Sequence, residues 1–368
     1  MTEHFEATKQ WLAKLVNLPG VSGFEDQVRV AVKEKLSGLP LFWYKDQLGG
    51  IFATPEHSVD QDLPCVLICG HLDEVGFMLT GMTEQGMLRF QAIGGWSSTV
   101  LPAQRVEVIT PKGPVLGVIT STPPHLLDDA KKNMTPSIEQ MLIDVGASSI
   151  HELKSMMIRP GLSVVPYGPF TELNDGKRWL AKAWDNRYGV GLAVETLEMF
   201  HNENLPYRIV CGATVQEEVG LRGANAASML IRPDIAFVLD ASPANDAFQS
   251  GPQTNGKLGN GVLIRLMDRT MVTSPRMVEW IVEVAESEHI SYQFYTSAGG
   301  TDAGQIHQSG IGVPTAVIGI CSRYIHSANS MIDPNDYFSA KKLLSELLRR
   351  LTPERIAWLQ GGQLPEEV

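Results

Sequence analysis

The sequence has little of what marks several large classes of protein. Cysteine occurs only four times in 368 residues, and Lys and Arg (30) are outnumbered by Asp and Glu (41), for a formal net charge of −11. The basic residues form no stripe, which argues against nucleic acid as a partner. No apolar run approaches the roughly 20 residues of a membrane span. We therefore expect a protein that binds neither nucleic acid nor membrane.

The cysteines and the first residues also bear on location. Cys65, Cys69, Cys211 and Cys321 lie within apolar, strand-like runs and form no spaced framework, so we expect buried, reduced thiols. The opening segment, MTEHFEATKQWLAKL, mixes charges with apolar residues at helical spacing, which is not the pattern of a secretory signal. The chain is expected to be cytoplasmic.

What the sequence has is an alternation of apolar strands and amphipathic helices. The apolar runs that predict strands are 64–70, 207–215, 234–240, 261–267 and 313–320. The helical patterns are 5–18, 25–37, 186–200, 221–231, 274–288 and 334–350. This order predicts an α/β layer structure with a largely parallel sheet. Ligands of such sheets gather at the carboxyl ends of the strands.

The segment 76–171 has a different texture, with short alternating stretches bounded by Gly, Pro and Thr and a single helical piece at 149–157. We interpret it as an all-β insertion, a small barrel or sandwich. It divides the α/β catalytic domain into 1–75 and 172–355. The last segment, 356–368, is expected to be a flexible tail.

Five residues near the ends of expected strands have the chemistry of metal ligands. They are His71 in CGHLDEVG, Asp185 in KAWDNRYG, Glu218 in VQEEVGLRG, Asp240 in FVLDAS and His326 in RYIHSAN. Imidazole and carboxylate suit zinc, and carboxylate also suits manganese. Five ligands are too many for one tetrahedral ion, whereas two ions that share a carboxylate would use them all.

Some of these ligands, and two acids next to them, have roles that must be weighed against simpler explanations. Asp185 is favoured here as the shared carboxylate, although Asp is also a common helix N-cap. Asp73 is assigned to orient the imidazole of His71, the alternative being a solvated loop residue. Glu217 and Glu218 are adjacent acids that would repel without a cation; Glu218 is assigned to the metal and Glu217 to general-base chemistry.

A glycine-containing loop, SAGGTDAGQIH, is the other candidate segment. Its glycines permit close backbone approach, so Thr301 and Asp302 are candidates for lining a substrate pocket. The alternative is that Asp302 caps the short helix that follows, and both interpretations stay open.

At these residues the sequence resembles the TET-type, glutamyl-aminopeptidase-like metallopeptidases, metallopeptidase family forty-two in the clan of co-catalytic zinc exopeptidases. The similarity runs through GHLDEVGFM, IGGWSSTVLPAQRVEV, IDVGASS, AWDNRYGVGLAVE, EEVGLRGA, GGTDAGQIH and RYIHSANSMID. Two departures from the pattern of this family lie near the expected pocket. Cys321-Ser322 stands before Arg323, where the family more often has Pro-Thr or Pro-Ser, and the acid that often follows Trp96 is missing.

The resemblance implies a phosphorylase/hydrolase-like, three-layer α/β catalytic domain interrupted by a PDZ-like or barrel-like dimerisation domain. It also implies dimers that assemble into a tetrahedral dodecamer. His71 and Asp240 would hold one metal, Glu218 and His326 the other, and Asp185 would bridge them. The clan further suggests a cis peptide at Asp185–Asn186.

The function predicted from these residues is removal of the N-terminal residue from peptides, by attack of a water held between two divalent ions with Glu217 as general base. Zinc is the expected metal, with cobalt or manganese as alternatives. A preference for N-terminal glutamate would require a cation in the pocket, and Arg323 and Lys257 are the candidates. Alternative functions are a glycoside hydrolase that uses paired carboxylates and a non-catalytic metal-binding assembly protein.

Overall fold

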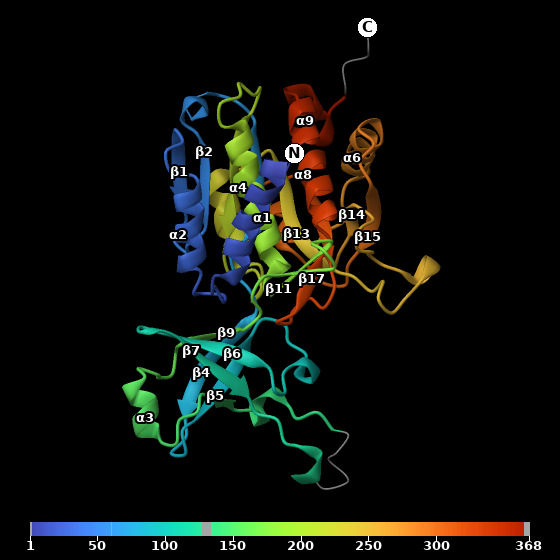
Figure 1. The fold of residues 1–368 in the computed structure, drawn as a ribbon. Coiled ribbons are helices and arrows are strands. Elements are labelled where there is room, and N and C mark those ends of the chain that lie inside the picture. The colour runs from blue at the N-terminus through green and yellow to red at the C-terminus, as the bar shows by residue number, and fades with distance from the viewer. Residues whose placement is uncertain (1, 60, 127–133, 364–368) are drawn as a thin grey trace.

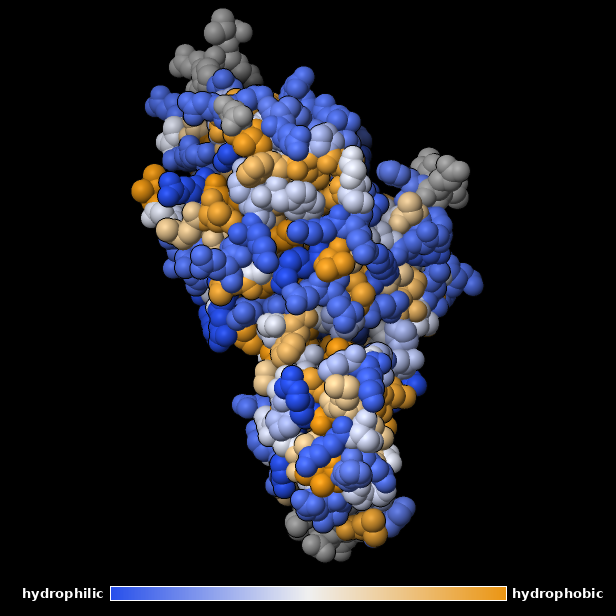
Figure 2. Space-filling model, turned by 90° about the vertical axis from the view of Figure 1, so that its left-hand side faces the viewer, coloured by the Kyte–Doolittle hydropathy of each residue, from blue (hydrophilic) through white to orange (hydrophobic). Residues whose placement is uncertain are grey.

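The computed structural model describes residues 2–59, 61–126 and 134–363, and within them the chain forms two lobes (Figures 1 and 2). The larger lobe contains an eight-stranded sheet with helices on both faces, and the smaller lobe is a closed β-barrel. The expected fold class, an α/β layer structure with an inserted all-β unit, is confirmed. Of the two forms expected for the insertion, the barrel is the one observed.

The eight-stranded sheet carries the residues of interest on its central strands. In spatial order the strands are β1 (Leu41–Lys45), β2 (Ile51–Pro55), β12 (Arg208–Thr214), β3 (Cys65–His71), β13 (Ile235–Pro243), β16 (Thr315–Ser322), β14 (Val262–Met267) and β15 (Tyr292–Thr296). The four central strands, β12, β3, β13 and β16, are parallel. Toward the edges, β2 runs antiparallel to β12 and β14 antiparallel to β16, so the expectation of a parallel sheet holds for its centre.

Helices cover both faces of this sheet. On one face lie α1 (Thr2–Asn17), α2 (Asp26–Lys35), α4 (Trp184–Phe200), α6 (Pro275–Ser287), α8 (Pro334–Arg350) and α9 (Pro353–Leu359), and on the other α5 (Arg222–Ile231) and α7 (Asp302–His307). Strand β3 shows why its sequence is apolar throughout: Val66 and Ile68 enter one core, and Leu67 and Cys69 enter the other. Because both faces are buried, the strand has no polar alternation.

The smaller lobe has a hydrophobic core of its own. Its strands are β4 (Gly76–Met82), β5 (Met87–Ile93), β8 (Ile143–Asp144), β7 (Gly113–Ile119), β6 (Arg105–Thr110) and β9 (Ser163–Pro166), in the order of the closed barrel, with α3 (Ile150–Ser155) beside them. Phe77, Leu88 and Val164 are buried in that core. The domain limits 1–75, 76–171 and 172–355 stay a prediction.

The remaining elements are short. A three-stranded sheet contains β10 (Thr171–Leu173), β11 (Arg178–Ala181) and β17 (Ser330–Ile332). The 3-10 helices are η1 (Glu56–Ser58), η2 (Ser98–Val100), η3 (Pro124–Leu126), η4 (Ile138–Gln140) and η5 (Gly251–Gln253). Within the described ranges, none of the helices combines the length and apolarity needed to span a membrane.

Two expectations need correction. Strand β13 does not end at Asp240 but continues to Pro243, because β16 pairs with it as far as Pro243↔Ser322. The segment from 356 was expected to be a flexible tail, but Ile356 and Leu359 are buried in α9 against the core of the larger lobe. Residues 364–368 of that segment lie outside the described residues.

Candidate metal centre

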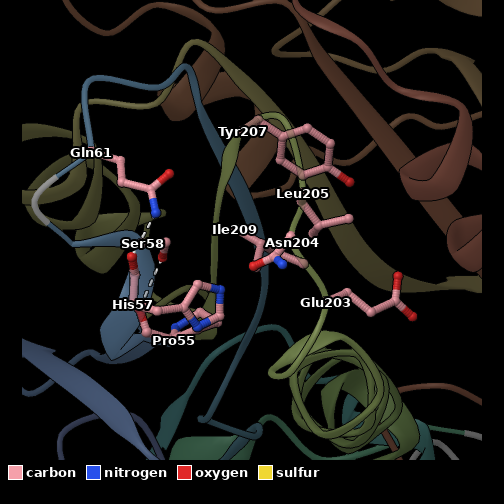
Figure 3. Close-up of a pocket in the computed structure, with 9 residues that line it drawn as sticks. All are labelled: Pro55, His57, Ser58, Gln61, Glu203, Asn204, Leu205, Tyr207 and Ile209. Atoms are coloured by element: carbon pink, nitrogen blue, oxygen red, sulfur yellow. Dashed lines mark hydrogen bonds between the residues drawn. The ribbon is translucent and has the colours of Figure 1, made fainter.

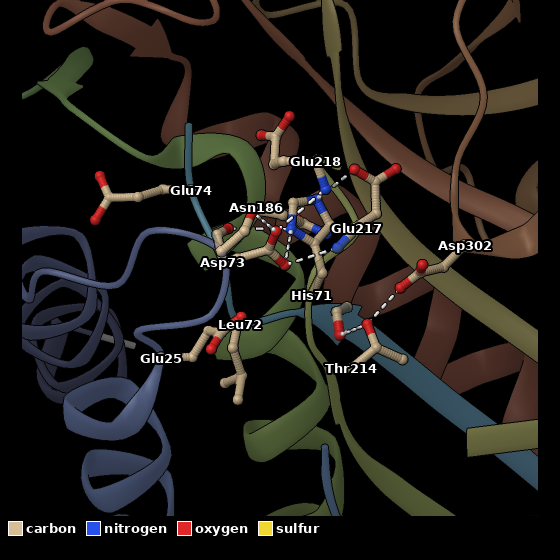
Figure 4. Close-up of polar contacts among 12 residues, drawn as sticks. Glu25, His71, Leu72, Asp73, Glu74, Asn186, Thr214, Glu217, Glu218 and Asp302 are labelled. Atoms are coloured by element: carbon tan, nitrogen blue, oxygen red, sulfur yellow. Dashed lines mark hydrogen bonds and ion pairs between the residues drawn. The ribbon is translucent and has the colours of Figure 1, made fainter. Parts of the chain in front are cut away.

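The five predicted ligands converge at the carboxyl edge of the central strands. His71 is the last residue of β3, Asp240 lies in β13, and Asp185 lies in the first turn of α4. Glu218 follows β12, and His326 follows β16. Figure 4 shows His71 beside the adjacent acids Glu217 and Glu218. Parallel strands place their carboxyl ends at one edge, which is why residues far apart in the sequence meet here.

Asp185 stands between the two histidines. Its Oδ1 lies 3.1 Å from Nε2 of His71, and its Oδ2 lies 3.3 Å from Nε2 of His326. Nε2 of His71 is also 3.8 Å from Oδ1 of Asp240, and Nε2 of His326 is 3.5 Å from Oε2 of Glu218. The two oxygens of one carboxylate therefore face two separate imidazoles.

The ligand atoms form compact groups. In the described chain three sets of three side chains hold one ligand atom each within 4.8 Å of one another, namely His71–Asp185–Asp240, Asp185–Glu218–His326 and His71–Glu217–Glu218. The first two sets have the membership expected for two metal positions that share Asp185. We name them the His71 site and the His326 site.

The backbone around Asp185 departs from a helix, which turns the carboxylate into the centre. Asp185 (φ −85°, ψ 103°) and Asn186 (φ −129°, ψ 44°) have non-helical dihedral angles, and the peptide bond between them is cis, as expected. The Asn186 amide donates to the carbonyl of Leu239 (2.7 Å) and accepts from the N–H of Gly189 (2.9 Å). Asp185 thus faces the histidines rather than serving as a simple helix cap.

Asp73 connects His71 with the pair of glutamates. The carbonyl oxygen of Asp73 is 3.1 Å from Nδ1 of His71, and its carboxylate Oδ1 is 3.4 Å from the same atom. The carboxylate also accepts the backbone N–H groups of Glu217 (3.0 Å) and Glu218 (3.1 Å) and the hydroxyl of Ser22 (2.6 Å). Asp73 is fully buried. The geometry therefore suits the expected orienting role and extends it to the loop that carries the glutamates.

Burial and neighbouring charges shift the pKa values of the acids and histidines at this centre. Burial raises the pKa of Glu218 to about 8, with the Asp185 carboxylate adding to the effect, and burial also raises the pKa of Glu217 well above its usual range. Burial disfavours protonated His71 and His326, but the surrounding carboxylates outweigh it and raise both pKa values, that of His326 to about 9. Burial alone would raise the pKa of Asp185, but hydrogen bonds with the two histidines lower it.

Two buried oxygens indicate that these residues fit a cation. Oε1 of Glu218 and Oδ1 of Asp240 have no hydrogen-bond partner among the described residues. A buried carboxylate oxygen without a donor is costly unless a proton or a cation compensates it. The donor set of imidazole and carboxylate suits zinc and related divalent ions. The residues present therefore fit divalent metal ions.

A cavity of about 880 Å³ opens onto the centre. Thr301 lies on its wall and is the N-cap of α7, accepting the N–H of Ala303. Asp302 is not among the lining residues; it is buried and contacts the hydroxyl of Thr214 (Figure 4). The alternative that Asp302 caps the helix is therefore wrong as well, because Thr301 holds that position.

The cations that line the cavity differ from the two predicted, Arg323 and Lys257. Arg323 does not line the cavity, because its guanidinium is held by Asp246 through bonds of 2.8 and 2.6 Å. Lys257 does not line it either. The arginines that do are Arg265 and Arg269, from the end of β14 and the loop after it. Sequence reasoning missed them, although a charge inside the apolar run GVLIRLM was an available signal.

Arg265 is buried and already held by neighbours, whereas Arg269 is exposed. Arg265 donates to Oδ2 of Asp268 (3.0 Å) and to the hydroxyl of Ser242 (2.7 Å). Arg269 makes no side-chain hydrogen bond or ion pair within the described ranges. The lining of the cavity thus combines the acids of the centre with the positive charge of Arg269.

A second cavity, of about 290 Å³, lies at the opposite edge of the sheet, where β2 ends and β12 begins (Figure 3). His57 and Glu203 are among its lining residues. It contains none of the metal-ligating groups found in the described chain. The larger cavity is therefore the candidate site.

Comparison with known proteins bears on what such a centre does. A family model described as M42 glutamyl aminopeptidase matches residues 49–343. The glutamyl aminopeptidase of Lactococcus lactis is 35% identical over 349 residues, covering 94% of this chain and 97% of that protein. The lysyl aminopeptidase of Pyrococcus furiosus is 32% identical, covering 93% and 97%.

Solved structures are similar along nearly the whole chain. A TET aminopeptidase from a marine sediment thaumarchaeon has a TM-score of 0.91 at 34% identity, covering 96% of this chain and 99% of that one. The TET1 peptidase of Pyrococcus horikoshii, which can assemble into a tetrahedron or an octahedral shell, has a TM-score of 0.83 at 29% identity, covering 94% and 100%. A structure called an endoglucanase, from Thermotoga maritima, has a TM-score of 0.75 at 30% identity, covering 95% and 98%.

The titration of the ligands generates a prediction about metal binding. A divalent cation must displace the protons that Glu218 and His326 hold at neutral pH, since their pKa values are raised to about 8 and about 9. For each proton that binding releases, the apparent Zn²⁺ affinity is therefore expected to fall by about tenfold with every pH unit as the pH decreases from about 9 to about 6. Calorimetric titration in buffers of different ionisation enthalpy measures both quantities, and an affinity independent of pH contradicts the expectation.

Proposed function

Because this chain belongs to the M42 glutamyl aminopeptidase family, we propose that it is an aminopeptidase that removes N-terminal residues from peptides with the help of two divalent metal ions. In this proposal His71, Asp185 and Asp240 hold one ion, and Asp185, Glu218 and His326 hold the other. Zinc is the expected metal, and cobalt and manganese are alternatives.

One observation carries the dinuclear part of the proposal. The carboxylate oxygens of Asp185 lie 3.1 and 3.3 Å from the Nε2 atoms of two histidines that belong to separate ligand groups. A structural zinc site needs only one closed set of ligands. Two sets that share a carboxylate, beside a cavity, support a two-metal hydrolase.

The residues divide the chemistry between them. Ions bound at the centre would supply Lewis acidity to the scissile carbonyl and make water more acidic. Glu217 stands beside them without belonging to either of the two sets that contain Asp185. Its carboxylate takes the proton of the attacking water and returns it to the leaving amine. A neighbouring cation favours the charged carboxylate and so offsets the raised pKa of Glu217 in the ion-free site.

The rival functions have less support. A glycoside hydrolase needs two carboxyl groups but no histidine, whereas both histidines here face carboxylates of the centre. The relative called an endoglucanase therefore carries less weight than the aminopeptidases. A non-catalytic metal-binding assembly protein would need the ligands but neither Glu217 nor a cavity that opens onto them.

The cavity also suggests a substrate preference. The free α-amino group of a peptide would face the carboxylates of Glu217, Glu218 and Asp240, all of which line the cavity. The side chain of the first residue would face the wall with Arg265 and Arg269. Among the residues that the structure describes, the acids lining this cavity are those of the centre. We propose that an acidic N-terminal residue is preferred over a basic one.

We also propose assembly and location. Dimers formed through the barrel are supported by Leu116 and Val118, which lie two residues apart on β7 and are 51% and 41% exposed. Assembly of the dimers into a tetrahedral dodecamer is supported by the shells described for the TET1 relative. A cytoplasmic location is supported by four free, buried cysteines.

Replacing Glu217 tests the assignment of the base. Glu217→Gln keeps the shape but cannot accept the proton, so kcat should fall by about 10²–10⁴-fold with unchanged metal content. Chromogenic aminoacyl substrates give kcat, and elemental analysis gives the metal content. Glu218→Gln, its matched neighbour, should lose bound metal. If Glu217→Gln also loses metal, base and ligand have been confused.

Arg269 offers a test of substrate preference. Wild type should cleave glutamyl better than leucyl, and leucyl better than lysyl, p-nitroanilide. Arg269→Ala should lower the glutamyl-to-leucyl ratio of kcat/KM by about tenfold, since a charged hydrogen bond contributes roughly 1.5–3 kcal/mol. Arg269→Lys is the charge-preserving control and should retain most of the ratio. A wild-type preference for lysyl substrate would refute the acidic pocket.

Assembly is tested by mass. Twelve chains of 40.3 kDa give a particle of roughly 480 kDa in sedimentation equilibrium. Leu116→Lys combined with Val118→Lys should reduce it to smaller species if β7 forms the dimer contact. A wild-type protein that remains monomeric at micromolar concentration contradicts the proposal.

A further inference from the structure

Each histidine of the centre has its Nδ1 atom next to a backbone carbonyl, and the two carbonyls belong to different lobes. Nδ1 of His71 lies 3.1 Å from the carbonyl of Asp73, which follows directly in the larger lobe. Nδ1 of His326 lies 2.8 Å from the carbonyl of Gly95, which lies between β5 and η2 in the barrel. A hydrogen bond from Nδ1 to a carbonyl leaves the lone pair of Nε2 directed at a metal.

The loop that carries Gly95 lies directly against the His326 site. A Cβ atom on Gly94 would stand 2.7 Å from Cγ1 of Val75 and 3.4 Å from Cβ of Glu218. A Cβ atom on Gly95 would stand 3.4 Å from Nδ1 of His326. Gly94 also has φ +80°, which glycine adopts at no steric cost. Glycine at position 94 therefore permits the turn that brings the loop against Glu218 and His326.

Trp96 attaches this loop to the barrel. Its ring stacks on Phe77, with centroids 4.8 Å apart and an interplanar angle of 24°, and its Nε1 donates to the carbonyl of Gly76 (3.1 Å). Phe77 is fully buried in the barrel core. The position of the Gly95 carbonyl thus depends on the barrel rather than on the sheet that carries the other ligands.

We infer that Gly94–Trp96 is a positioning loop for the His326 site alone, so that the barrel sets the affinity of one metal position and not of the other. The inference rests on the proposed dinuclear centre. In the described part of the chain, the partners of His71 at this site are Asp73, Asp185 and Asp240, which all belong to the larger lobe. Movement of the barrel against the sheet would change one ion's affinity first.

Replacing Trp96 is the direct test. Trp96→Ala removes the stacking and the hydrogen bond that hold the loop. In calorimetric Zn²⁺ titration of the full-length protein, one of the two binding steps should lose about 10–100-fold in affinity, as expected when the hydrogen-bond partner of a metal-ligating histidine is lost, while the other step stays unchanged. Co²⁺ absorption spectra should show the same loss of one site.

Three further variants keep the test interpretable. Gly94→Ala disturbs the same loop, because φ is +80° there and the added methyl group would stand 2.7 Å from Cγ1 of Val75, and it should weaken the same step even if Trp96→Ala does not fold. Trp96→Phe retains a stacking ring and should remain near wild type. Leu153→Ala, which removes a fully buried side chain of α3 from the barrel core, should lower Tm while leaving both binding steps intact.

The outcomes separate the two proposals. A wild-type chain that binds fewer than two cations overturns the dinuclear centre itself. A wild-type chain that binds two, with both steps unchanged in Trp96→Ala and Gly94→Ala, overturns only the role of the loop. Equal weakening of both steps in Gly94→Ala also overturns it, because the inferred effect is confined to the His326 site.

Discussion

The centre depends on a single carboxylate that faces two imidazoles. Asp185 lies within 3.3 Å of both His71 and His326, and the neighbouring acids are buried. Burial raises the pKa values of Glu217 and Glu218, because several buried negative charges cannot coexist without compensation. Protons would supply that compensation without bound metal, and cations would supply it in the proposed enzyme. The repulsion that makes the cluster costly therefore favours the binding of cations.

A buried ion network beneath the centre holds the segments that carry these ligands. Glu74 accepts bonds from Lys182 (2.6 and 2.7 Å) and from Arg187 (3.2 Å), and Arg187 also donates to the carbonyl of Leu72. Leu72 and Glu74 flank Asp73, whereas Lys182 and Arg187 flank Asp185. The burial of Lys182 lowers its pKa to about 8. Two loops from distant parts of the chain are thus linked by charge pairs that would be costly to break singly.

The barrel has two roles in the proposed enzyme. Strand β7 exposes Leu116 and Val118, the side chains proposed to contact another copy of the chain. The loop after β5 reaches the cavity, where Gly95, Ser97 and Val100 form part of the wall. In the proposed assembly the barrel would therefore provide a physical route by which contact between copies influences metal binding. The route passes through one hydrogen bond, between Gly95 and His326.

The sequence alone predicted the layer architecture and a set of candidate ligands that the fold brings together. Both follow from local rules: apolar runs predict buried strands, and His71, Glu218 and His326 stand where such strands end. The tertiary structure alone decided that Arg269 rather than Arg323 borders the cavity, and that Gly95 orients His326. Those contacts join segments from separate lobes and loops, and no periodicity encodes them. Such partners depend on how distant segments pack against each other, because a side chain can contact only the groups that the fold places near it.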